Sequence, residues 1–423
     1  MKRSAVSASV IILLSLGAVS LGAQMQTSAP WAAGVSRPQD LIVQLVTIGP
    51  ADPIYTWWGH SALVVEDSRL GVSRFYNYGL FSFEQESFVR NFAMGRLWFQ
   101  VGASDTGREL AFYRYLGRRI RIQILNLSPN KRMQMALFLE NNILPQNRTY
   151  LYDHYYDNCA TRVRDLIDRT VDGQLAEAAT ARGRMTLRQH TRRFTAHGVF
   201  MDWLLMFLMS GVIDRPITRW EEMFLPAELE TNVADLRYRD ETGTERPLVE
   251  RSVLYYEGSE QREPLELAPP LWPKTLIPAM ALALLGMLAA AFTRRADRSK
   301  TGWTLFGIYS VLLGVLMGIP GAVLFFMSQF TDHTVTYANE NLFLANPLAL
   351  AALPLGLIVA FGGRRSSRRL LQLLWLLAAA IAAVYLPLKS LAVFDQQNAP
   401  ALAAYLPLLF AAAVVAALSW KRA

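Results

Sequence analysis

The last third of this 423-residue chain consists of apolar stretches long enough to cross a lipid bilayer. Five of them can be marked out: Leu276–Phe292, Leu305–Met327, Pro347–Phe361, Leu370–Pro387 and Leu402–Ser419. With 52% hydrophobic residues and a mean hydropathy of +0.19, the chain is too apolar for an ordinary soluble protein of this size. The earlier residues alternate charged and apolar groups, so the sequence predicts a globular part followed by an all-α transmembrane domain over residues 275–423.

Positive charge between the apolar stretches predicts which side of the membrane each loop occupies. Lysine and arginine gather in Thr293–Lys300, in Arg364–Arg369 and at the end of the chain, all on one side if every stretch crosses. The other two loops, near residues 328–346 and 388–400, carry little positive charge. The positive-inside rule therefore places the basic loops in the cytoplasm and residues 24–274 outside.

The N-terminus predicts export as well. Two basic residues follow the initial methionine, an apolar run covers Ala5–Gly22, and small residues end the run at Ala23. Residues 1–23 therefore have the features of a secretory signal peptide, or of an N-terminal anchor if they are not cleaved. We expect a multi-pass protein of the bacterial inner (cytoplasmic) membrane, with its globular part on the periplasmic side.

The exported part is expected to be a mixed α+β domain around an antiparallel sheet, covering residues 24–235. Alternation of apolar and polar residues predicts strands at Leu41–Ile48, Ser61–Glu66, Arg74–Tyr78, Arg96–Ala103 and Arg118–Leu127. Helices are predicted at Phe83–Ala93, at Thr106–Leu116, from Pro129 to about Asn142 behind a Ser128 cap, and from Cys159 behind an Asn158 cap.

Two later segments complete this part of the chain. Thr186–Thr195 is predicted to be a basic helix, and Val199–Leu208 is apolar but too short to span, so we expect it in the core or at the membrane surface. Residues 236–274 are predicted to hold a hairpin that pairs Leu236–Tyr238 with Val253–Tyr256, and then a proline-rich linker.

The net charge of +8 has two interpretations. Arginines are spread through the exported domain, among them Arg114, Arg118, Arg119 and Arg121. They are either solvated surface residues or part of a surface attracted to anionic lipid head groups. Nothing in the sequence resembles a nucleic-acid-binding module, so no nucleic-acid partner is expected.

The chain has one cysteine, Cys159, in the run YDNCATR at residues 156–162. A thiol in the first turn of a helix lies near unpaired N–H groups and the positive end of the dipole, which favour the reactive thiolate. Without a second cysteine, it forms neither an intramolecular disulfide nor a thiolate metal cluster. The alternative is that Cys159 is only a small buried hydrophobic residue.

A cysteine nucleophile needs a base within hydrogen-bond reach and a group that orients the base. Of the five histidines, His60 suits best, because it follows a glycine and begins a strand. His154 is expected to be structural, and His190 and His197 are expected at the surface. Asn77, in the next strand, is the candidate orienting group, as in other Cys-His-Asn sites; otherwise it belongs to a turn.

Several other residues near these candidates have alternative roles. Trp58 and Tyr156 belong either to the core or to an aromatic wall at the membrane surface. Arg162 is expected to form a local salt bridge with Asp165. The external loop near residues 328–346 is either a solvated turn or part of a site at the membrane surface that includes His333, Asn339 and Asn341.

Several separated motifs occur in an order that matches a known family. They are GHS at residues 59–61, YNYG at 76–79, FSF at 81–83, DNCATR at 157–162 and MFLP at 223–226. Together they resemble the Lnb-type bacterial lipoprotein N-acyltransferases over most of the exported domain. The membrane half matches in layout, including Asp332-His333 followed by Asn339 and Asn341.

The resemblance implies a permuted papain-like, NlpC-related fold in which the histidine precedes the cysteine. It implies Cys159 as nucleophile and His60 as base. Many relatives have histidine as the third residue, whereas this chain offers Asn77. Candidates for contacts to the substrate or its oxyanion are Trp58, Asn158, Tyr156, Arg162, His333 and Asn339, with the backbone N–H of Cys159.

The function expected from this resemblance is acyl transfer without a cofactor or metal. A phospholipid would donate a fatty acyl chain to Cys159, and the resulting thioester would acylate the α-amino group of a diacylated lipoprotein. We expect a monomer embedded in the bilayer. The alternatives are a membrane-anchored NlpC-like peptidoglycan peptidase or amidase and a non-catalytic membrane scaffold, although a hydrolase of soluble peptidoglycan needs at most one anchor.

Overall fold

The computed structural model describes residues 28–81, 87–259, 262–294 and 299–420. The signal peptide or anchor expected at residues 1–23 lies outside the described residues, as does the first part of the helix expected from Phe83. The chain forms two compact units. One joins the residues up to Met185 with Pro216–Pro264, and the other joins Thr186–Arg215 with Leu265–Ala423.

The first unit is built on an antiparallel sheet of seven strands in the order β6-β4-β3-β2-β1-β5-β9. This confirms the mixed α+β class, and the first predicted strand has the predicted bounds. The strands are β1 (Leu41–Ile48), β2 (His60–Asp67), β3 (Val72–Leu80), β4 (Trp98–Asp105), β5 (Ile120–Leu125), β6 (Thr149–Leu151) and β9 (Val249–Tyr256).

A hairpin forms after Leu236, as predicted, but the predicted pairing of Leu236–Tyr238 with Val253–Tyr256 is wrong. Instead, β7 (Arg237–Arg239) pairs with β8 (Glu245–Pro247), and β9 pairs with β5 at the edge of the main sheet. The reason is the turn, in which Asp240 accepts hydrogen bonds from the backbone N–H groups of Thr242 and Thr244. This turn closes directly onto the three-residue strand β8.

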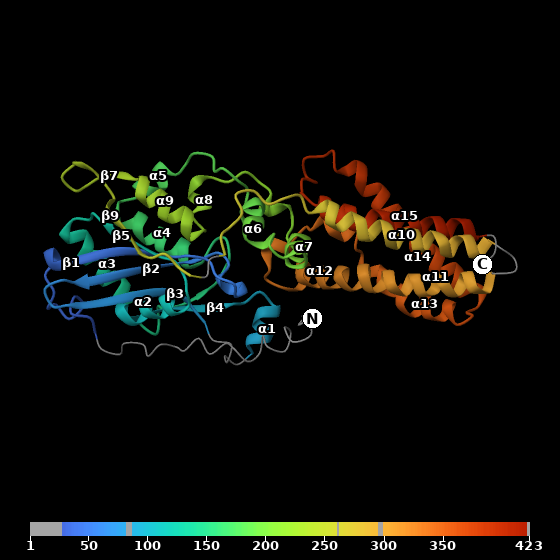
Figure 1. Ribbon diagram of the computed structural model, residues 1–423, viewed down its shortest axis with the longest axis horizontal. Coiled ribbons are helices and arrows are strands. Elements are labelled where there is room, and N and C mark those ends of the chain that lie inside the picture. The colour runs from blue at the N-terminus through green and yellow to red at the C-terminus, as the bar shows by residue number, and fades with distance from the viewer. Residues whose placement is uncertain (1–27, 82–86, 260–261, 295–298, 421–423) are drawn as a thin grey trace. The chain divides into compact units, whose positions relative to one another are not determined.

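Helices cover both faces of the main sheet (Figure 1). Side chains alternate along each strand, so Leu63 and Val65 of β2 pack into the core with α3 (Pro129–Asn142), α4 (Cys159–Thr170) and α9 (Pro226–Asp235). Ala62 and Val64 face the opposite way and pack with Leu110 and Tyr113 of α2 (Thr106–Tyr115). The shorter helices of this unit are α1 (Phe88–Ala93), α5 (Gln174–Ala178) and α8 (Arg219–Glu222).

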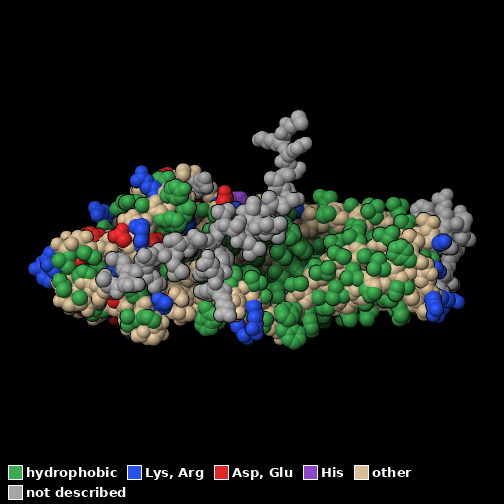
Figure 2. Space-filling view, turned by 90° about the horizontal axis from the view of Figure 1, so that it is seen from below, with side chains coloured by type: hydrophobic (Ala, Val, Ile, Leu, Met, Phe, Trp, Pro, Cys, Tyr) green, Lys and Arg blue, Asp and Glu red, His purple; other side chains and the backbone are tan. Residues whose placement is uncertain are grey.

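The second unit is helical, and each of the five predicted apolar stretches forms helix. The helices are α10 (Trp272–Arg294), α11 (Ser299–Leu313), α12 (Ile319–Phe330), α13 (Ala352–Ala360), α14 (Arg365–Leu388) and α15 (Ala399–Ser419). Among the described residues, three helical runs are long and apolar enough to cross a membrane: Lys300–Phe330, Arg365–Leu388 and Ala399–Ser419. Trp272–Leu288 and Pro347–Ala360 are shorter apolar helices. Figure 2 shows hydrophobic side chains over most of the visible surface of this unit.

Residues 186–215 belong to the helical unit, so the first unit is not continuous over residues 24–235 as expected. The segment forms α6 (Leu187–Thr195), the basic helix that the sequence predicted, and α7 (Val199–Leu208). Hydrogen bonds between this segment and the rest of the helical unit explain why it belongs there. The amides of Asn339 and Asn341 donate hydrogen bonds to the carbonyl oxygen of Phe207 at 3.2 and 2.8 Å, near the end of α7.

His190 is buried, contrary to the expectation that it lies at the surface. It shares one face of α6 with Leu187, Thr191 and Phe194, which are also buried. The arginines beside it in the sequence suggested exposure. However, Arg188 is itself buried, because it forms an ion pair with the buried Asp214 at 2.6 Å.

The two loops expected outside the membrane meet at one end of the helical unit, where α7 also ends. Gln396 donates hydrogen bonds to the carbonyl oxygen of Met209 at 3.2 Å and to the amide oxygen of Asn339 at 3.1 Å. Its own backbone N–H donates to Glu340 at 2.8 Å. The basic loop that precedes α14 lies about 36 Å away from this end, because α14 has 24 residues.

Candidate active site

Cys159 is the first residue of α4, and the residue before it fixes its position. The side-chain oxygen of Asn158 accepts hydrogen bonds from the N–H groups of Ala160 at 2.8 Å and Thr161 at 3.0 Å. The side chain of Thr161 accepts from the Asn158 N–H in return, which completes a capping box and confirms the predicted cap. The Asn158 amide also donates to the carbonyl oxygens of His154 and Phe224, so both ends of this side chain are hydrogen-bonded to the backbone.

His60 and Asn77 form the second part of the site. They lie at the start of β2 and near the end of β3, where Ala62 pairs with Asn77. Nε2 of His60 is 2.7 Å from Oδ1 of Asn77. Because a carboxamide oxygen only accepts, Nε2 carries the proton and Nδ1 remains available as a base. The Asn77 amide donates in turn to the hydroxyl of Tyr113 at 3.4 Å, which fixes its orientation.

Gly79 lies beside both the cysteine and the histidine. A Cβ atom placed on Gly79 would lie 3.7 Å from Cε1 of His60 and 4.0 Å from Cβ of Cys159. The ladder between β3 and β4 shifts between Tyr78 and Leu80, and Gly79 has a φ of +107°. This bulge, and the absence of a side chain, leave the space in which a cysteine from α4 approaches a histidine from the sheet.

The protonation states of the pair follow from burial. Burial raises the pKa of the Cys159 thiol, while the N–H groups of Ser61 and Ala160 and the charge of Arg118 act in the opposite direction. Burial and then the charge of Arg118 lower the pKa of His60 to about 4, against the effect of its hydrogen bond with Asn77. At neutral pH the site therefore holds a neutral thiol beside a neutral imidazole. The thiolate expected from the helix N-terminus is not the resting state, because burial outweighs the helix.

Arg118 is a part of the site that the sequence analysis placed with the surface arginines. Its side chain is only 4% exposed, and its Nε donates to the carbonyl oxygen of Gly49 at 2.9 Å. Its guanidinium lies 5.4 Å from the ring centre of Tyr113, whose ring is 6.3 Å from that of His60. Within the described part of the chain, Nη2 of Arg118 is buried without a hydrogen-bond partner. The sequence around Arg118 does not distinguish it from its neighbours Arg119 and Arg121. In the structure, those two arginines form ion pairs with Glu257 and Glu230.

The raised thiol pKa gives a direct test of this site. We expect the rate of Cys159 alkylation by iodoacetamide to keep rising with pH beyond about 8.5, the pKa of a free thiol. Arg118→Met should raise the pKa values of both Cys159 and His60, and so slow alkylation at a fixed pH. Mass spectrometry of the alkylated protein measures both effects.

The matched control for this test is Arg121→Met. Arg121 is the second residue of β5, and its side chain is 43% exposed. We expect its alkylation profile to follow that of the unaltered protein. A plateau of the alkylation rate below pH 7 in the unaltered protein would show a thiolate–imidazolium pair and contradict the neutral pair.

Of the remaining candidates in this unit, Trp58 and Arg162 have structural partners, whereas Tyr156 is exposed. The ring of Trp58 lies 4.5 Å from that of His154, and burial lowers the pKa of this histidine to about 4. Tyr156 is 47% exposed. Arg162 forms a two-point ion pair with Asp157 at 2.6 and 2.7 Å, so the expected salt bridge to Asp165 is wrong. Asp157, just before the helix, faces the guanidinium, and Asp165 instead pairs with Arg164 at 2.7 Å.

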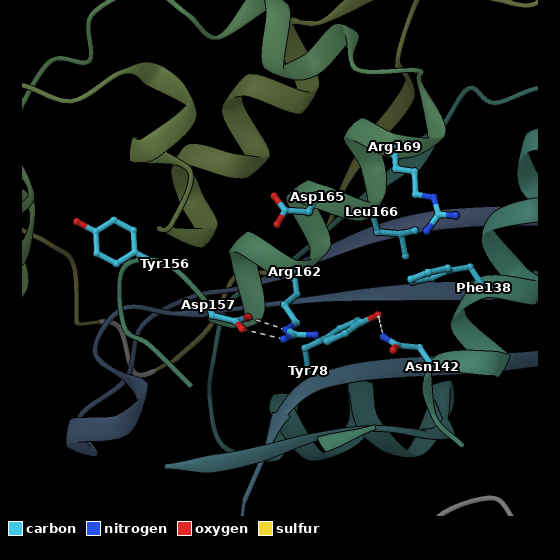
Figure 3. A pocket seen from close by; sticks show the side chains of 9 residues that line it. All are labelled: Tyr78, Phe138, Asn142, Tyr156, Asp157, Arg162, Asp165, Leu166 and Arg169. Atoms are coloured by element: carbon cyan, nitrogen blue, oxygen red, sulfur yellow. Dashed lines mark hydrogen bonds and ion pairs between the residues drawn. The ribbon is translucent and has the colours of Figure 1, made fainter. Parts of the chain in front are cut away.

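A surface pocket of about 400 Å³ lies beside α4 (Figure 3). Arg162 lies between Asp157 and Tyr78 there, and Asn142 donates a hydrogen bond to the Tyr78 hydroxyl at 2.8 Å. Cys159, His60 and Asn77 are not among the residues that line it. The pocket is therefore separate from the reacting groups.

His333 and Asn339 belong to the helical unit. Asn339 is buried, and its amide donates to the carbonyl oxygens of Phe207 and Leu208. The carbonyl oxygen of His333 accepts a hydrogen bond from Thr336 at 2.8 Å. In the described parts of both units, no group of three or more histidine, cysteine or acidic side chains is arranged to hold a metal ion.

Comparison with known families gives one match on each half of the chain. The Lnb N-terminal periplasmic domain matches residues 28–193, which include Cys159, His60 and Asn77. The Lnb transmembrane domain matches residues 272–422, from α10 to α15. No curated protein and no solved structure matches the chain, so the papain-like likeness remains a prediction.

Proposed function

The chain belongs to the Lnb family, and we propose that it is a membrane-bound cysteine acyltransferase. In this proposal, a fatty acyl chain moves from a membrane phospholipid to Cys159, and then to the α-amino group of a diacylglyceryl-modified lipoprotein. The placement of Cys159 and the His60–Asn77 pair beside the same glycine, Gly79, supports the proposal, because it brings a nucleophile, a base and an orienting group into one region.

The first half-reaction forms a thioester. Nδ1 of His60 takes the thiol proton as the sulfur of Cys159 attacks the ester carbonyl carbon of the phospholipid. Backbone N–H groups at the start of α4 stabilise the oxyanion of the tetrahedral intermediate. The ester C–O bond then breaks, and the lysophospholipid oxygen takes the proton from His60. The neutral resting pair suits this step, because the base is free to accept a proton.

The second half-reaction transfers the acyl group to nitrogen. The free α-amino group of the lipoprotein attacks the thioester carbonyl, and His60 takes a proton from the amine. The C–S bond breaks, and the proton on His60 returns to the sulfur of Cys159. The products are an N-acylated lipoprotein and the enzyme in its starting state.

The proposed location is the bacterial inner membrane, with several crossings and the catalytic unit in the periplasm. Both proposed substrates, a phospholipid and a lipid-modified protein, are held in the outer leaflet of that membrane. Three long apolar helices support this location, as does the separation of the basic loop before α14 from the end where α7 lies.

The experiment that tests the function is mass spectrometry of lipoprotein N-terminal peptides from cells with and without the protein. We expect the peptides to lose the mass of one acyl chain from the α-amino group when the protein is absent. Unchanged lipoproteins would contradict the proposal. Unchanged lipoproteins together with altered peptidoglycan fragments would instead identify a peptidoglycan peptidase or amidase.

A further inference from the structure

Four aromatic side chains form a continuous row in the first unit. The ring of Phe99, in β4, stacks on that of Tyr152 with centres 4.3 Å apart, and on that of Phe81 with centres 4.9 Å apart. The edge of Tyr55 meets Phe81, with ring centres 6.3 Å apart. Phe81, Phe99 and Tyr152 are part-buried, and Tyr55 is 51% exposed. The row therefore runs from the interior of the unit to its surface.

Phe99, the second ring of this row, lies beside the reacting groups. The Cβ position of Gly79, which is 3.7 Å from His60 and 4.0 Å from Cys159, is also 4.0 Å from Cδ2 of Phe99. Phe99 therefore borders the same empty space as the thiol and the imidazole. A group attached to the sulfur of Cys159 and directed past Gly79 would meet the ring of Phe99.

The chemistry of the row suits an alkyl chain. Phe81 and Phe99 have no polar side-chain atoms, and the hydroxyl of Tyr152 lies 3.4 Å from Nδ1 of His154, which satisfies it within the protein. The stacked rings are inclined to one another by 13° and 21°, so they pack face to face and present their apolar edges to a neighbouring alkyl chain. A peptide backbone would need hydrogen-bonding groups that Phe81 and Phe99 do not supply, whereas methylene groups gain by leaving water for such a surface.

We propose that Tyr55, Phe81, Phe99 and Tyr152 form the surface that binds the fatty acyl chain carried on Cys159. The carbons nearest the thioester lie against Phe99, and later carbons extend past Phe81 toward Tyr55. The inference rests on the proposed function, because the covalent bond to Cys159 is what fixes the occupant. It assigns the choice of chain length to Phe99 of β4 and to residues just beyond β3 and β6, outside the Cys-His-Asn set.

The test compares acyl donors that differ only in chain length. The purified full chain, in detergent micelles, is mixed with p-nitrophenyl butyrate or p-nitrophenyl palmitate, and the acyl adduct on Cys159 is followed by intact-protein mass spectrometry. We expect faster acylation by palmitate than by butyrate in the unaltered protein. In Phe81→Ala, the ratio of the palmitate rate to the butyrate rate should fall by about tenfold or more.

Two further variants complete this test. Tyr55→Ala removes an exposed ring, so folding of the core does not depend on it, and the ratio should fall in the same direction. Tyr115→Ala is the matched control, because Tyr115 is an 86% exposed tyrosine in α2 of the same unit and outside the row. Its ratio should equal that of the unaltered protein.

The outcomes separate the two proposals. If the unaltered protein acquires no acyl adduct from either ester or from phospholipid, the proposed function fails. If adducts form but Phe81→Ala and Tyr55→Ala keep the unaltered palmitate-to-butyrate ratio, acyl transfer stands and the aromatic row is overturned as the chain-binding surface. Should Phe81→Ala fail to fold, Tyr55→Ala alone decides.

Discussion

Cys159→Ser should abolish acyl transfer, with a loss of about 10⁴-fold or more in the rate of acyl-enzyme formation. A serine hydroxyl has nearly the same size as the thiol, but it is a far weaker nucleophile when its neighbouring base has a pKa of about 4. The purified protein is incubated with phospholipid, and intact-protein mass spectrometry measures the adduct. Hydroxylamine should remove the adduct from the unaltered protein, because thioesters are cleaved by it.

The same substitution should leave the fold intact. Cys159 only borders the core of the first unit, and the Asn158 cap that begins α4 does not use the cysteine side chain. Circular dichroism and the melting temperature of Cys159→Ser should therefore match those of the unaltered protein. N-acylated lipoproteins in cells that carry only Cys159→Ser would show that the thiol is not the nucleophile.

Gly79→Val should reduce acylation of Cys159 by at least about 100-fold. Its φ of +107° lies where a β-branched residue is strained, at a cost of about 1–3 kcal/mol. The new side chain would also occupy the space bordered by His60, Cys159 and Phe99, where the ester carbonyl must enter. The rate of adduct formation and the melting temperature should both fall.

Gly71→Val separates these two effects. Gly71 also has a positive φ, of +64°, in the turn between β2 and β3, but a Cβ atom there would meet no atom within 4 Å. This variant should lose stability through backbone strain and keep its rate of Cys159 acylation. If Gly79→Val lost no more activity than Gly71→Val, the space beside Gly79 would have no role in the reaction.

The parts of the site that the sequence predicted are those set by neighbouring residues. Asn158 before the cysteine and Ser128 before a proline act as caps, because capping involves residues two or three positions apart. His60 and Asn77 could be predicted as well, because both lie in strands whose apolar and polar residues alternate. The family motifs then supported the pairing of these strands with the cysteine helix.

The parts that the sequence did not predict depend on contacts between distant residues. β9 pairs with β5 more than 100 residues earlier, and β9 alone does not specify that partner. The protonation of the thiol depends on how deeply the folded unit buries it, and that burial reversed the effect expected from the helix N-terminus. Arg118 lies in a run of arginines, and only its hydrogen bond to Gly49 and its place beside Tyr113 distinguish it.

The bonds that hold α7 have a consequence for the time course of synthesis. Asn339 and Asn341 follow Phe207 by 132 and 134 residues, so a ribosome completes α7 well before its partners exist. At a typical elongation rate this delay is roughly 7–26 s. During that interval the apolar side chains of α7, with Val199 and Phe200 exposed even in the finished fold, need shelter at the bilayer surface or from a chaperone. In the proposed topology, α7 gains these bonds only after the loop that contains Asn339 has been exported, so a chain stalled before that loop would keep α7 without its partners.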